Sequence, residues 1–437
     1  MAQENRFIPA SLSRRRFLQY SGSLTLGSSL LAACAGTGSS GGSSSSTASS
    51  GGSTPTLTQW YHQYGEKGTH EAVLKYAKDY TKAKVNVSWV PGTGTEYPDK
   101  VRAALLGSKA PDVFELPSIS VDQVKAGLLE PLDDLIADVK SDFNPASLAP
   151  FTVNGKVYGI KMINDLTFVY YRKSMFKQAG LEIPKTIDDL IAAAKKLTNG
   201  NRKGIYIGPD GGVDALNQIA GWSSGGDFIS GDNKIVFNTD RMAAAYEKIH
   251  ELNASGGVLP DAPTFWWDSS SFQQGTVAMQ WCGLWAMPLI RASQVGDDFG
   301  IFPYPALDAQ GKPATVNGGW AEIVNAKSPN KQAAKDYVKE LWITNTQVQT
   351  DWNVAYGFHV PPRTSTSTQT TKLKSSPASD AVDILNKYGH ATPPLWNNAM
   401  DTALRTAVSN IVKGSKNGRA ELDAAAAKAN AELQKEL

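Results

Sequence analysis

After residue 55, hydrophobic and polar positions alternate with two different periods. Short runs with a period of two predict strands, and longer runs with apolar residues at helical spacing predict helices. In chain order, the pattern predicts a strand at 57–60, a helix at 69–82, a strand at 85–90, a helix at 100–107 and a strand at 112–116. This order of strands and helices favours a mainly parallel sheet covered by helices.

The same alternation returns later in the chain and predicts a second α/β unit. Thr186 and Asp189 have the spacing of a helix cap, and residues 204–207 read as a strand. Residues 240–253 have apolar side chains along one helical face. A further helix is predicted at 329–342, with Ser328 as its N-cap.

Residues 1–33 have the features of an export signal. A basic cluster, Arg14 to Arg16, precedes an apolar stretch that ends just before Cys34. This stretch is shorter than the ~20 residues needed to cross a bilayer, and small residues precede the cysteine as a cleavage site requires. The pattern resembles a twin-arginine signal joined to a lipobox, in which Cys34 is acylated and becomes the mature N-terminus.

Two alternatives stay open for this segment. Cys34 is a chance residue if cleavage occurs elsewhere, and the general export route is open because a third arginine is present and Gln19 departs from the twin-arginine pattern. Residues 34–54 are nearly all Gly, Ser, Thr and Ala, a composition that predicts a disordered tether. The prediction is therefore a lipid-anchored protein that works outside the cytoplasm.

Charge and composition narrow the class of protein. The 437 residues include 43 basic and 41 acidic residues; without residues 1–33, which hold four arginines and one glutamate, 39 and 40 remain. This balance argues against a nucleic-acid partner. No later apolar run is long enough for a membrane span, and the length suits two domains. If Cys34 carries lipid, Cys282 has no disulfide partner, and we expect it to be a small buried core residue.

Several segments resemble the family 1 extracellular solute-binding proteins of bacterial ABC importers, the group that includes maltose-binding protein. Their order and spacing carry the resemblance, which covers almost the whole chain after the tether. They are 155–160, 169–181, 272–279 followed by Gly283-Leu284-Trp285, Gly318-Gly319-Trp320, and 328–331 with the helix after them.

The resemblance implies a two-lobed α/β fold of the type II periplasmic-binding-protein kind, each lobe a mainly parallel sheet flanked by helices. It places the ligand in a cleft and makes an ABC permease the partner of a monomeric protein without a cofactor. By analogy, the chain crosses between lobes near 159–164, 305–316 and 356–362. The first lobe is then 55–160 plus 308–357, and the second is 161–307 plus 358–437.

Tryptophans are candidates for ligand contact. The chain has 11 of them, and several lie beside Gly and small polar residues where loops begin. A sugar ring has an apolar face, so an indole flanked by hydrogen-bonding side chains suits it. The candidates are Trp222, Trp285 and Trp320, then Trp267 and Trp396. Core packing is the alternative for each of them, and it is the expectation for Trp89, Trp342 and Trp352.

Polar candidates lie at predicted strand ends and crossings. Glu115 and Asp165 are the strongest, because a carboxylate accepts hydrogen bonds from two adjacent hydroxyls. A helix cap or a solvated loop is the alternative for both. His359 and Arg363 are weaker candidates, for which hinge packing or a surface role is expected. The remaining candidates are His62, Gln63, Ser118, Asn164, Asp268 and Gly319, whose missing side chain allows close approach of a ligand.

The residues predict a binding protein and no hydrolase constellation. There is no His-Glu-x-x-His and no Gly-Lys-Ser/Thr phosphate loop, and the five histidines are scattered. We expect a sugar ligand, disaccharide or oligosaccharide, with another polar metabolite such as a glycerol phosphate as the alternative. A lipid-anchored glycan-degrading enzyme and a purely adhesive lipoprotein are the rival classes.

Overall fold

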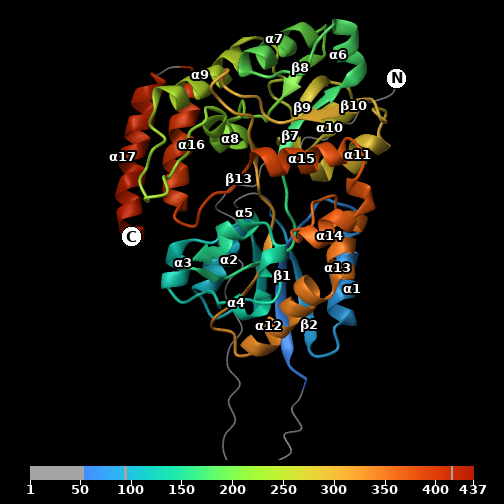
Figure 1. Ribbon diagram of the computed structural model, residues 1–437, viewed down its shortest axis with the longest axis vertical. Coiled ribbons are helices and arrows are strands. Elements are labelled where there is room, and N and C mark those ends of the chain that lie inside the picture. Colours follow the sequence, from blue (N-terminus) through green and yellow to red (C-terminus); the bar gives the residue numbers. More distant parts are fainter. Residues whose placement is uncertain (1–53, 93–95, 415–416) are drawn as a thin grey trace, which may run out of the picture. The chain divides into compact units, whose positions relative to one another are not determined.

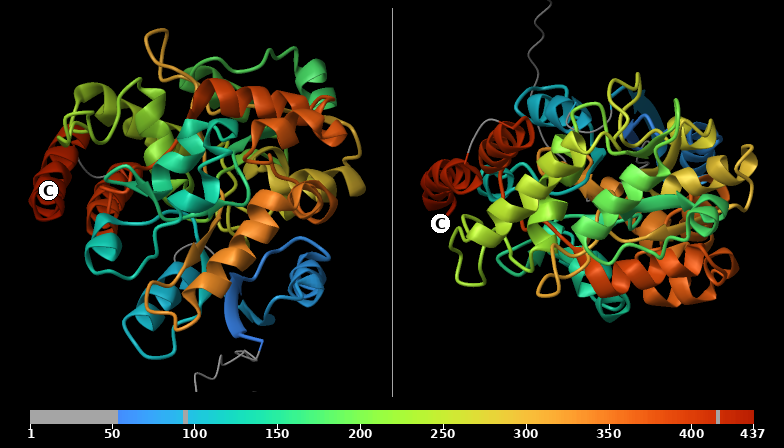
Figure 2. Two further views of the ribbon diagram at one scale, coloured as in Figure 1. Left: turned by 60° about the horizontal axis from the view of Figure 1, so that its bottom comes forward. Right: turned by 90° about the horizontal axis from the view of Figure 1, so that it is seen from above.

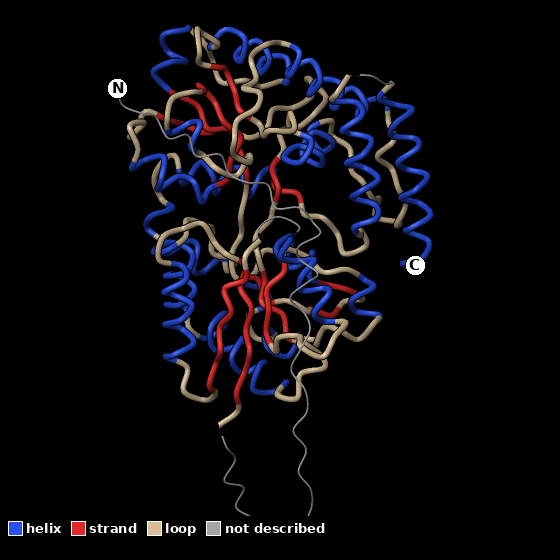
Figure 3. Tube along the Cα trace, turned by 180° about the vertical axis from the view of Figure 1, so that it is seen from behind, coloured by secondary structure: helices blue, strands red, loops and turns tan. Residues whose placement is uncertain are grey.

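The computed structural model describes residues 54–92, 96–414 and 417–437. The predicted signal, Cys34 and nearly all of the tether lie outside these residues. The described chain forms two lobes, each built on its own β-sheet (Figures 1 and 3). We call the part around the five-stranded sheet the first lobe and the part around the four-stranded sheet the second lobe. This architecture confirms the predicted two-lobed α/β class.

The sheet of the first lobe mixes parallel and antiparallel strands. Strand β1 pairs in parallel with β2 and β3, whereas β12 runs antiparallel to both β3 and β6. The three strands predicted near the start of the body are all present, with small shifts at their ends. In sheet order the strands are β2 (Lys84–Val90), β1 (Thr56–His62), β3 (Val113–Leu116), β12 (Ala321–Val324) and β6 (Ile160–Lys161).

Helices cover both faces of this sheet, as the alternation of buried side chains requires. Leu57 and Tyr61 of β1 pack on one face with Val338 and Trp342, whereas Phe114 of β3 packs on the other face. The helices of the first lobe are α1 (Thr69–Asp79), α2 (Glu96–Leu105), α3 (Val121–Lys125), α4 (Asp133–Ile136), α5 (Pro145–Leu148), α12 (Lys331–Lys339), α13 (Thr346–Thr350) and α14 (Thr364–Gln369).

The sheet of the second lobe is mostly antiparallel. Strand β7 runs antiparallel to β10 and β9, and only β8 and β9 are parallel, so the expected mainly parallel arrangement is wrong here. Every residue of β9 is buried, and such a run looks the same in either arrangement. In sheet order the strands are β10 (Phe299–Phe302), β7 (Thr167–Arg172), β9 (Val277–Gly283) and β8 (Lys203–Tyr206).

Two layers of helices enclose the second sheet. Helices α7, α8, α9, α16 and α17 share one core, with α16 and α17 side by side at the edge of the lobe (Figures 1 and 2). The helices of this lobe are α6 (Lys173–Ala179), α7 (Ile187–Leu197), α8 (Val213–Ser223), α9 (Asp240–Ala254), α10 (Ser270–Gln273), α11 (Met287–Ala292), α15 (Ala378–Tyr388), α16 (Asn398–Val412) and α17 (Gly418–Glu436).

Two of the three predicted helix starts are confirmed. Thr186 and Asp189 form a reciprocal capping box at α7, and α9 begins at the predicted residue. Ser328 is not an N-cap: α12 begins at Lys331 after Asn330. The Ser328 hydroxyl donates to Asp112 Oδ1 at 2.5 Å and accepts from the backbone N–H of Asn330, so it ties the loop after β12 to the residue just before β3.

The segments expected to cross between lobes lie against one another. Asn164 exchanges backbone hydrogen bonds with Val360, and Asp165 does so with Gly318. At the second expected crossing, the two-residue strand β11 (Thr315–Val316) pairs with β13 (Gly389–His390). Elsewhere in the first lobe, the short strands β4 (Thr152–Val153) and β5 (Lys156–Val157) form a hairpin. The lobe boundaries themselves stay a prediction.

Candidate functional site

Glu115 is the centre of a polar cluster at the carboxyl ends of β1 and β3. The backbone N–H and the Nδ1 atom of His62 both lie 2.5 Å from Glu115 Oε1. The hydroxyl of Tyr64 donates to Glu115 Oε2 at 2.7 Å. Glu115 is fully buried and His62 nearly so. Two of the predicted site residues therefore meet, and both oxygens of the carboxylate are held.

Aromatic rings surround this cluster. Trp320 stacks on the ring of His62 with centroids 4.0 Å apart, and Tyr64 lies 3.8 Å from His62 on the same measure. The rings of Tyr97 and Trp320 are T-shaped to one another, with centroids 5.8 Å apart. Because Trp320 is only half-buried, part of the indole stays accessible. The structure thus joins Trp320 with His62 and Glu115, which the sequence could place only on separate segments.

Asp165 belongs to a second charged cluster, in which His359 lies between two carboxylates. His359 Nδ1 is 2.5 Å from Asp165 Oδ1, and His359 Nε2 is 3.1 Å from Glu66 Oε1. Burial favours the neutral ring, but the two carboxylates outweigh it and raise the pKa of His359 to about 10. Burial also opposes ionisation of Glu66, yet the bond and charge of His359 lower the pKa of this carboxyl.

Glu66 was missed by sequence reasoning, which gave His359 only a weak weight. Glu66 lies in the loop that follows β1, in the same loop as the predicted Gln63 and four residues after the predicted His62, and this position was the available signal. A loop carboxylate four residues beyond a strand end also suits a solvated surface. Only the fold shows that a histidine almost 300 residues later reaches it.

The turn at Gly319 brings these two clusters together. Gly319 has a φ of +100°, and a Cβ at this position would lie 2.2 Å from the carbonyl oxygen of Ile163. The predicted close approach at Gly319 is therefore between two backbone segments, and binding of a ligand there stays a prediction. Lys161 Nζ lies 3.5 Å from the Gly319 carbonyl oxygen, and burial lowers the pKa of Lys161 to about 7. Asn164 is buried beside the same turn.

The second lobe presents an exposed aromatic pair on the loop that leads into α10. Phe265 and Trp267 are stacked with centroids 5.6 Å apart, and 59% and 37% of their surfaces are exposed. The backbone behind them is fixed: the Trp267 carbonyl oxygen accepts from the Trp285 indole at 3.2 Å and from the Cys282 thiol at 3.3 Å. The Asp268 carbonyl oxygen accepts from Gln280 at 2.6 Å.

Trp285 and Cys282 are the two donors that fix the backbone at Trp267. Trp285 is half-buried, and its ring lies over Gly283, where any Cβ would collide with it. Cys282 is a free, buried thiol whose pKa is raised to about 12, chiefly by burial, so the predicted core role is confirmed. Trp266, which the sequence did not single out, donates to Asp214 at 2.7 Å.

Two predicted platform residues lie inside the core of the second lobe. Trp222 is 3% exposed and stacks on His390 with centroids 4.8 Å apart, and Trp396 is 8% exposed and meets Phe228 edge-on. Both rings therefore pack in the core in this structure, and their contact with ligand stays a prediction. Trp342 and Trp352 are buried in the first lobe as expected, while Trp89 is half-buried.

Gln63 and Ser118 are exposed. Ser118 borders a pocket of about 120 Å³ together with Arg102 and Asn398.

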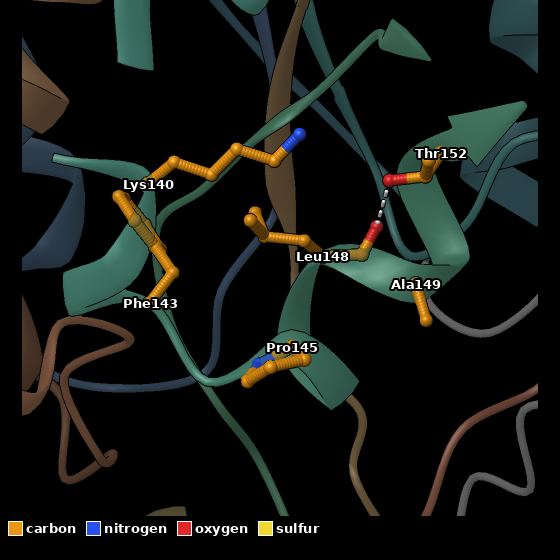
Figure 4. A pocket seen from close by; sticks show the side chains of 6 residues that line it. All are labelled: Lys140, Phe143, Pro145, Leu148, Ala149 and Thr152. Carbon is orange, nitrogen blue, oxygen red and sulfur yellow. Dashed lines mark hydrogen bonds between the residues drawn. The ribbon is translucent and has the colours of Figure 1, made fainter. Parts of the chain in front are cut away.

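A larger pocket of about 410 Å³ lies on the first lobe, and none of the predicted site residues lines it (Figure 4). Its lining is mostly apolar: Lys140, Phe143, Pro145, Leu148, Ala149 and Thr152, whose hydroxyl donates to the Leu148 carbonyl oxygen.

Residues 221–225 have the Gly-x-Ser-x-Gly spacing of a hydrolase nucleophile elbow, which the sequence reasoning overlooked. A true elbow is a sharp turn from a strand into a helix. Ser223 instead ends helix α8, is fully buried, and donates its hydroxyl to the Ala220 carbonyl oxygen at 2.7 Å. The geometry does not make Ser223 a nucleophile.

These observations define a class of protein. Two α/β lobes meet where three chain segments pair, and carboxylates and indoles gather at strand ends beside them, the usual place for a ligand in open α/β sheets. This arrangement is that of a two-lobed binding protein. The chain belongs to the bacterial extracellular solute-binding proteins, whose family model matches residues 71–381. The family places the chain outside the cytoplasm.

Two bacterial proteins are similar to this chain in sequence. The chain is 31% identical over 266 residues to a probable ABC transporter-binding protein of Deinococcus radiodurans, covering 56% of this chain and 61% of that protein. It is 27% identical to the diacetylchitobiose binding protein DasA of Streptomyces coelicolor, covering 65% of this chain and 68% of the relative.

A solved structure of similar fold is the GacH receptor of Streptomyces glaucescens, determined unliganded and in complex with acarbose. It is 26% identical, has a TM-score of 0.73, and covers 88% of this chain and 99% of the other. In the residues that the structure describes, no helix is long and apolar enough to cross a membrane.

Proposed function

We propose that this protein is the substrate-binding component of an ABC transporter and that it captures a disaccharide or oligosaccharide between its lobes. The observation that carries the proposal is the stacking of Trp320 on His62, which is itself held by buried Glu115. A partly exposed tryptophan beside fixed polar groups offers both an apolar face and hydrogen bonds to one ligand. Sugars have both kinds of surface.

The acidic character of the surroundings favours a neutral sugar over a phosphorylated metabolite. Glu66 and Asp165 share one histidine, and Glu115 lies in the neighbouring cluster. Carboxylates accept hydrogen bonds from hydroxyls strongly but repel a phosphate. The names of two similar proteins, which bind diacetylchitobiose and acarbose, support a sugar ligand as well.

Transport requires that the ligand be handed on unchanged, so we propose a binding protein without catalytic activity. Ligand contacts from both lobes are complete only when the lobes close, and binding therefore shifts the population toward the closed form. We propose that a permease recognises this closed, monomeric form. Residues 1–33 are proposed to direct export, and acyl chains on Cys34 are proposed to hold the exported protein at the membrane.

A thermal-shift screen tests the proposal. The panel contains N,N′-diacetylchitobiose, acarbose, maltotriose, further neutral di- and trisaccharides, and glycerol 3-phosphate. A ligand that binds only the folded protein raises the melting temperature, by mass action. We expect a rise with at least one neutral oligosaccharide, none with glycerol 3-phosphate, and recovery of the bound sugar intact by chromatography. A rise with the phosphate alone, or cleavage of the sugar, contradicts the proposal.

A further inference from the structure

We infer that His359 is a positioning residue that holds the carboxylates of Glu66 and Asp165 in place for the ligand. The inference deepens the proposed function and rests on it. The sequence favoured hinge packing or a surface role at His359, and the structure shows a more specific arrangement. One ring nitrogen faces each carboxylate, and the three residues come from three separate segments.

The ring of His359 is more deeply buried than the carboxylates of Glu66 and Asp165. The side chain of His359 is 3% exposed, whereas those of Glu66 and Asp165 are each 14% exposed. The ring therefore lies behind the carboxylates, and the carboxylates reach the surface. Asp165 Oδ2 has no hydrogen-bond partner among the residues that the structure describes, so one oxygen is left to accept from a ligand.

An imidazolium is well suited to this position. It has two N–H donors that point in opposite directions, whereas a neutral imidazole has one donor and one acceptor. A carboxylate facing the acceptor nitrogen would be repelled, so only the doubly protonated ring orients both carboxylates at once. Its charge also reduces the repulsion between the two acidic groups. Fixing them before the ligand arrives lowers the entropy lost on binding.

The backbone connects this triad to the Trp320 cluster. Glu66 lies four residues after His62 on the loop that follows β1. Asp165 exchanges backbone hydrogen bonds with Gly318, two residues before Trp320. Movement of either carboxylate therefore changes the surroundings of the stacked Trp320 and His62 rings. On this geometry, His359 acts on ligand binding without touching the ligand.

The first test compares His359→Gln with Arg363→Gln in the full chain. Arg363 lies near the same crossing, forms an ion pair with Asp142 at 2.7 Å and donates to the Ile343 carbonyl oxygen, so its bonds go to neither cluster. Affinity for the strongest sugar of the screen is measured by calorimetry well below the melting temperature. We expect His359→Gln to weaken binding at least tenfold and Arg363→Gln to leave it within twofold, while both lower the melting temperature.

A double-mutant cycle with Glu66→Gln separates positioning from general loss of structure. If His359 acts through Glu66, the double variant should bind the sugar only slightly less tightly than whichever single variant binds it less tightly. Additive losses, or unchanged binding by His359→Gln, overturn the inference.

Nitrogen-15 spectroscopy of wild-type protein gives a readout that does not need the variant to fold. We expect both ring nitrogens of His359 to be protonated at pH 8, and the ring resonances to shift when the sugar binds. A singly protonated ring at pH 8 overturns the inference while leaving sugar binding intact. Failure of the wild type to bind any sugar overturns the proposed function and this inference together.

Discussion

Glu115 and Glu322 are directly paired across neighbouring strands β3 and β12, and both side chains are fully buried. Burial, and then the charge of Glu115, raise the pKa of Glu322 to about 8. Glu322 Oε1 accepts from Gln59 at 2.6 Å, and Gln59 in turn accepts from the Tyr337 hydroxyl at 2.8 Å. Glu322 therefore keeps its proton at neutral pH, directly beside the carboxylate that holds His62.

Stability should fall as the pH rises because of this pair. The folded-state pKa of Glu322 lies above the ordinary value of 4.5, so its contribution is fully present below pH 4.5 and is lost as the pH rises through 8. Within that window, the loss approaches about 1.4 kcal/mol per pH unit. The variant Glu322→Gln cannot titrate, and its free energy of unfolding should lack this decline.

Urea unfolding of wild type and Glu322→Gln at pH values from 5 to 9 measures the difference. We expect the free energy of unfolding of the variant to rise relative to wild type up to about pH 8 and the difference to level off above it. His359 adds a decline of the same sign between its ordinary value and about 10 in both proteins, so only the difference between them is informative. Parallel curves would show that Glu322 is ionised in the folded protein.

Gly319 should resist substitution far more than its neighbour Gly318. Gly319→Ala introduces a Cβ 2.2 Å from the Ile163 carbonyl oxygen at a φ of +100°, whereas a Cβ at Gly318 lies no closer than 3.5 Å to any atom. Strain at such a position costs about 1–3 kcal/mol before the clash is counted. We expect Gly319→Ala to lower the melting temperature markedly and Gly318→Ala to change it little. Equal melting temperatures would contradict the close contact.

The spacing of hydrophobic and polar positions predicted most helices and strands, because burial follows the periodicity of each kind of element. The first three strands and helix α9 are found where the pattern places them. Strand direction was not predictable from it: residues 277–283 of β9 are apolar or buried throughout, which gives no information on the direction of the neighbours. The Ser328 cap failed because its hydroxyl serves a distant carboxylate, Asp112.

The candidate site was only partly predictable for a related reason. His62 and Glu115 were expected from their positions at strand ends, and the fold brings them into contact. Long-range partners such as His359 and Glu66 carry no local signal, since 293 positions separate them in the sequence. Trp222 lies beside glycines and serines, as a ligand platform does, yet tertiary packing encloses the rings of both Trp222 and Trp396.

Cys34 lies outside the described residues, and its role is tested by fractionation. One acyl chain binds a membrane only marginally, and the multiple acylation implied by the lipobox resemblance gives durable attachment. We expect Cys34→Ala to move the protein from the membrane fraction to the soluble fraction, with Cys282→Ala as the matched control that stays anchored. If Cys34→Ala still pelleted with membranes after a salt wash, lipid attachment at this residue would be excluded.

The last prediction concerns the indoles. Trp320→Ala removes the ring that stacks on His62, and Trp285→Ala removes the donor that fixes the loop carrying Trp267. If each indole contacts sugar, each variant should lose about 2 kcal/mol or more of binding free energy, as buried aromatic hot spots do.

Trp342 is the control, because it is 1% exposed within the core of the first lobe. Trp342→Ala should destabilise the fold by about 3–5 kcal/mol and leave the affinity of the remaining folded protein nearly unchanged. Calorimetry with melting curves separates these effects, since a ligand contact changes affinity and a core contact changes stability. Normal affinity in both Trp285→Ala and Trp320→Ala would move the sugar site away from these residues even though the family assignment stands.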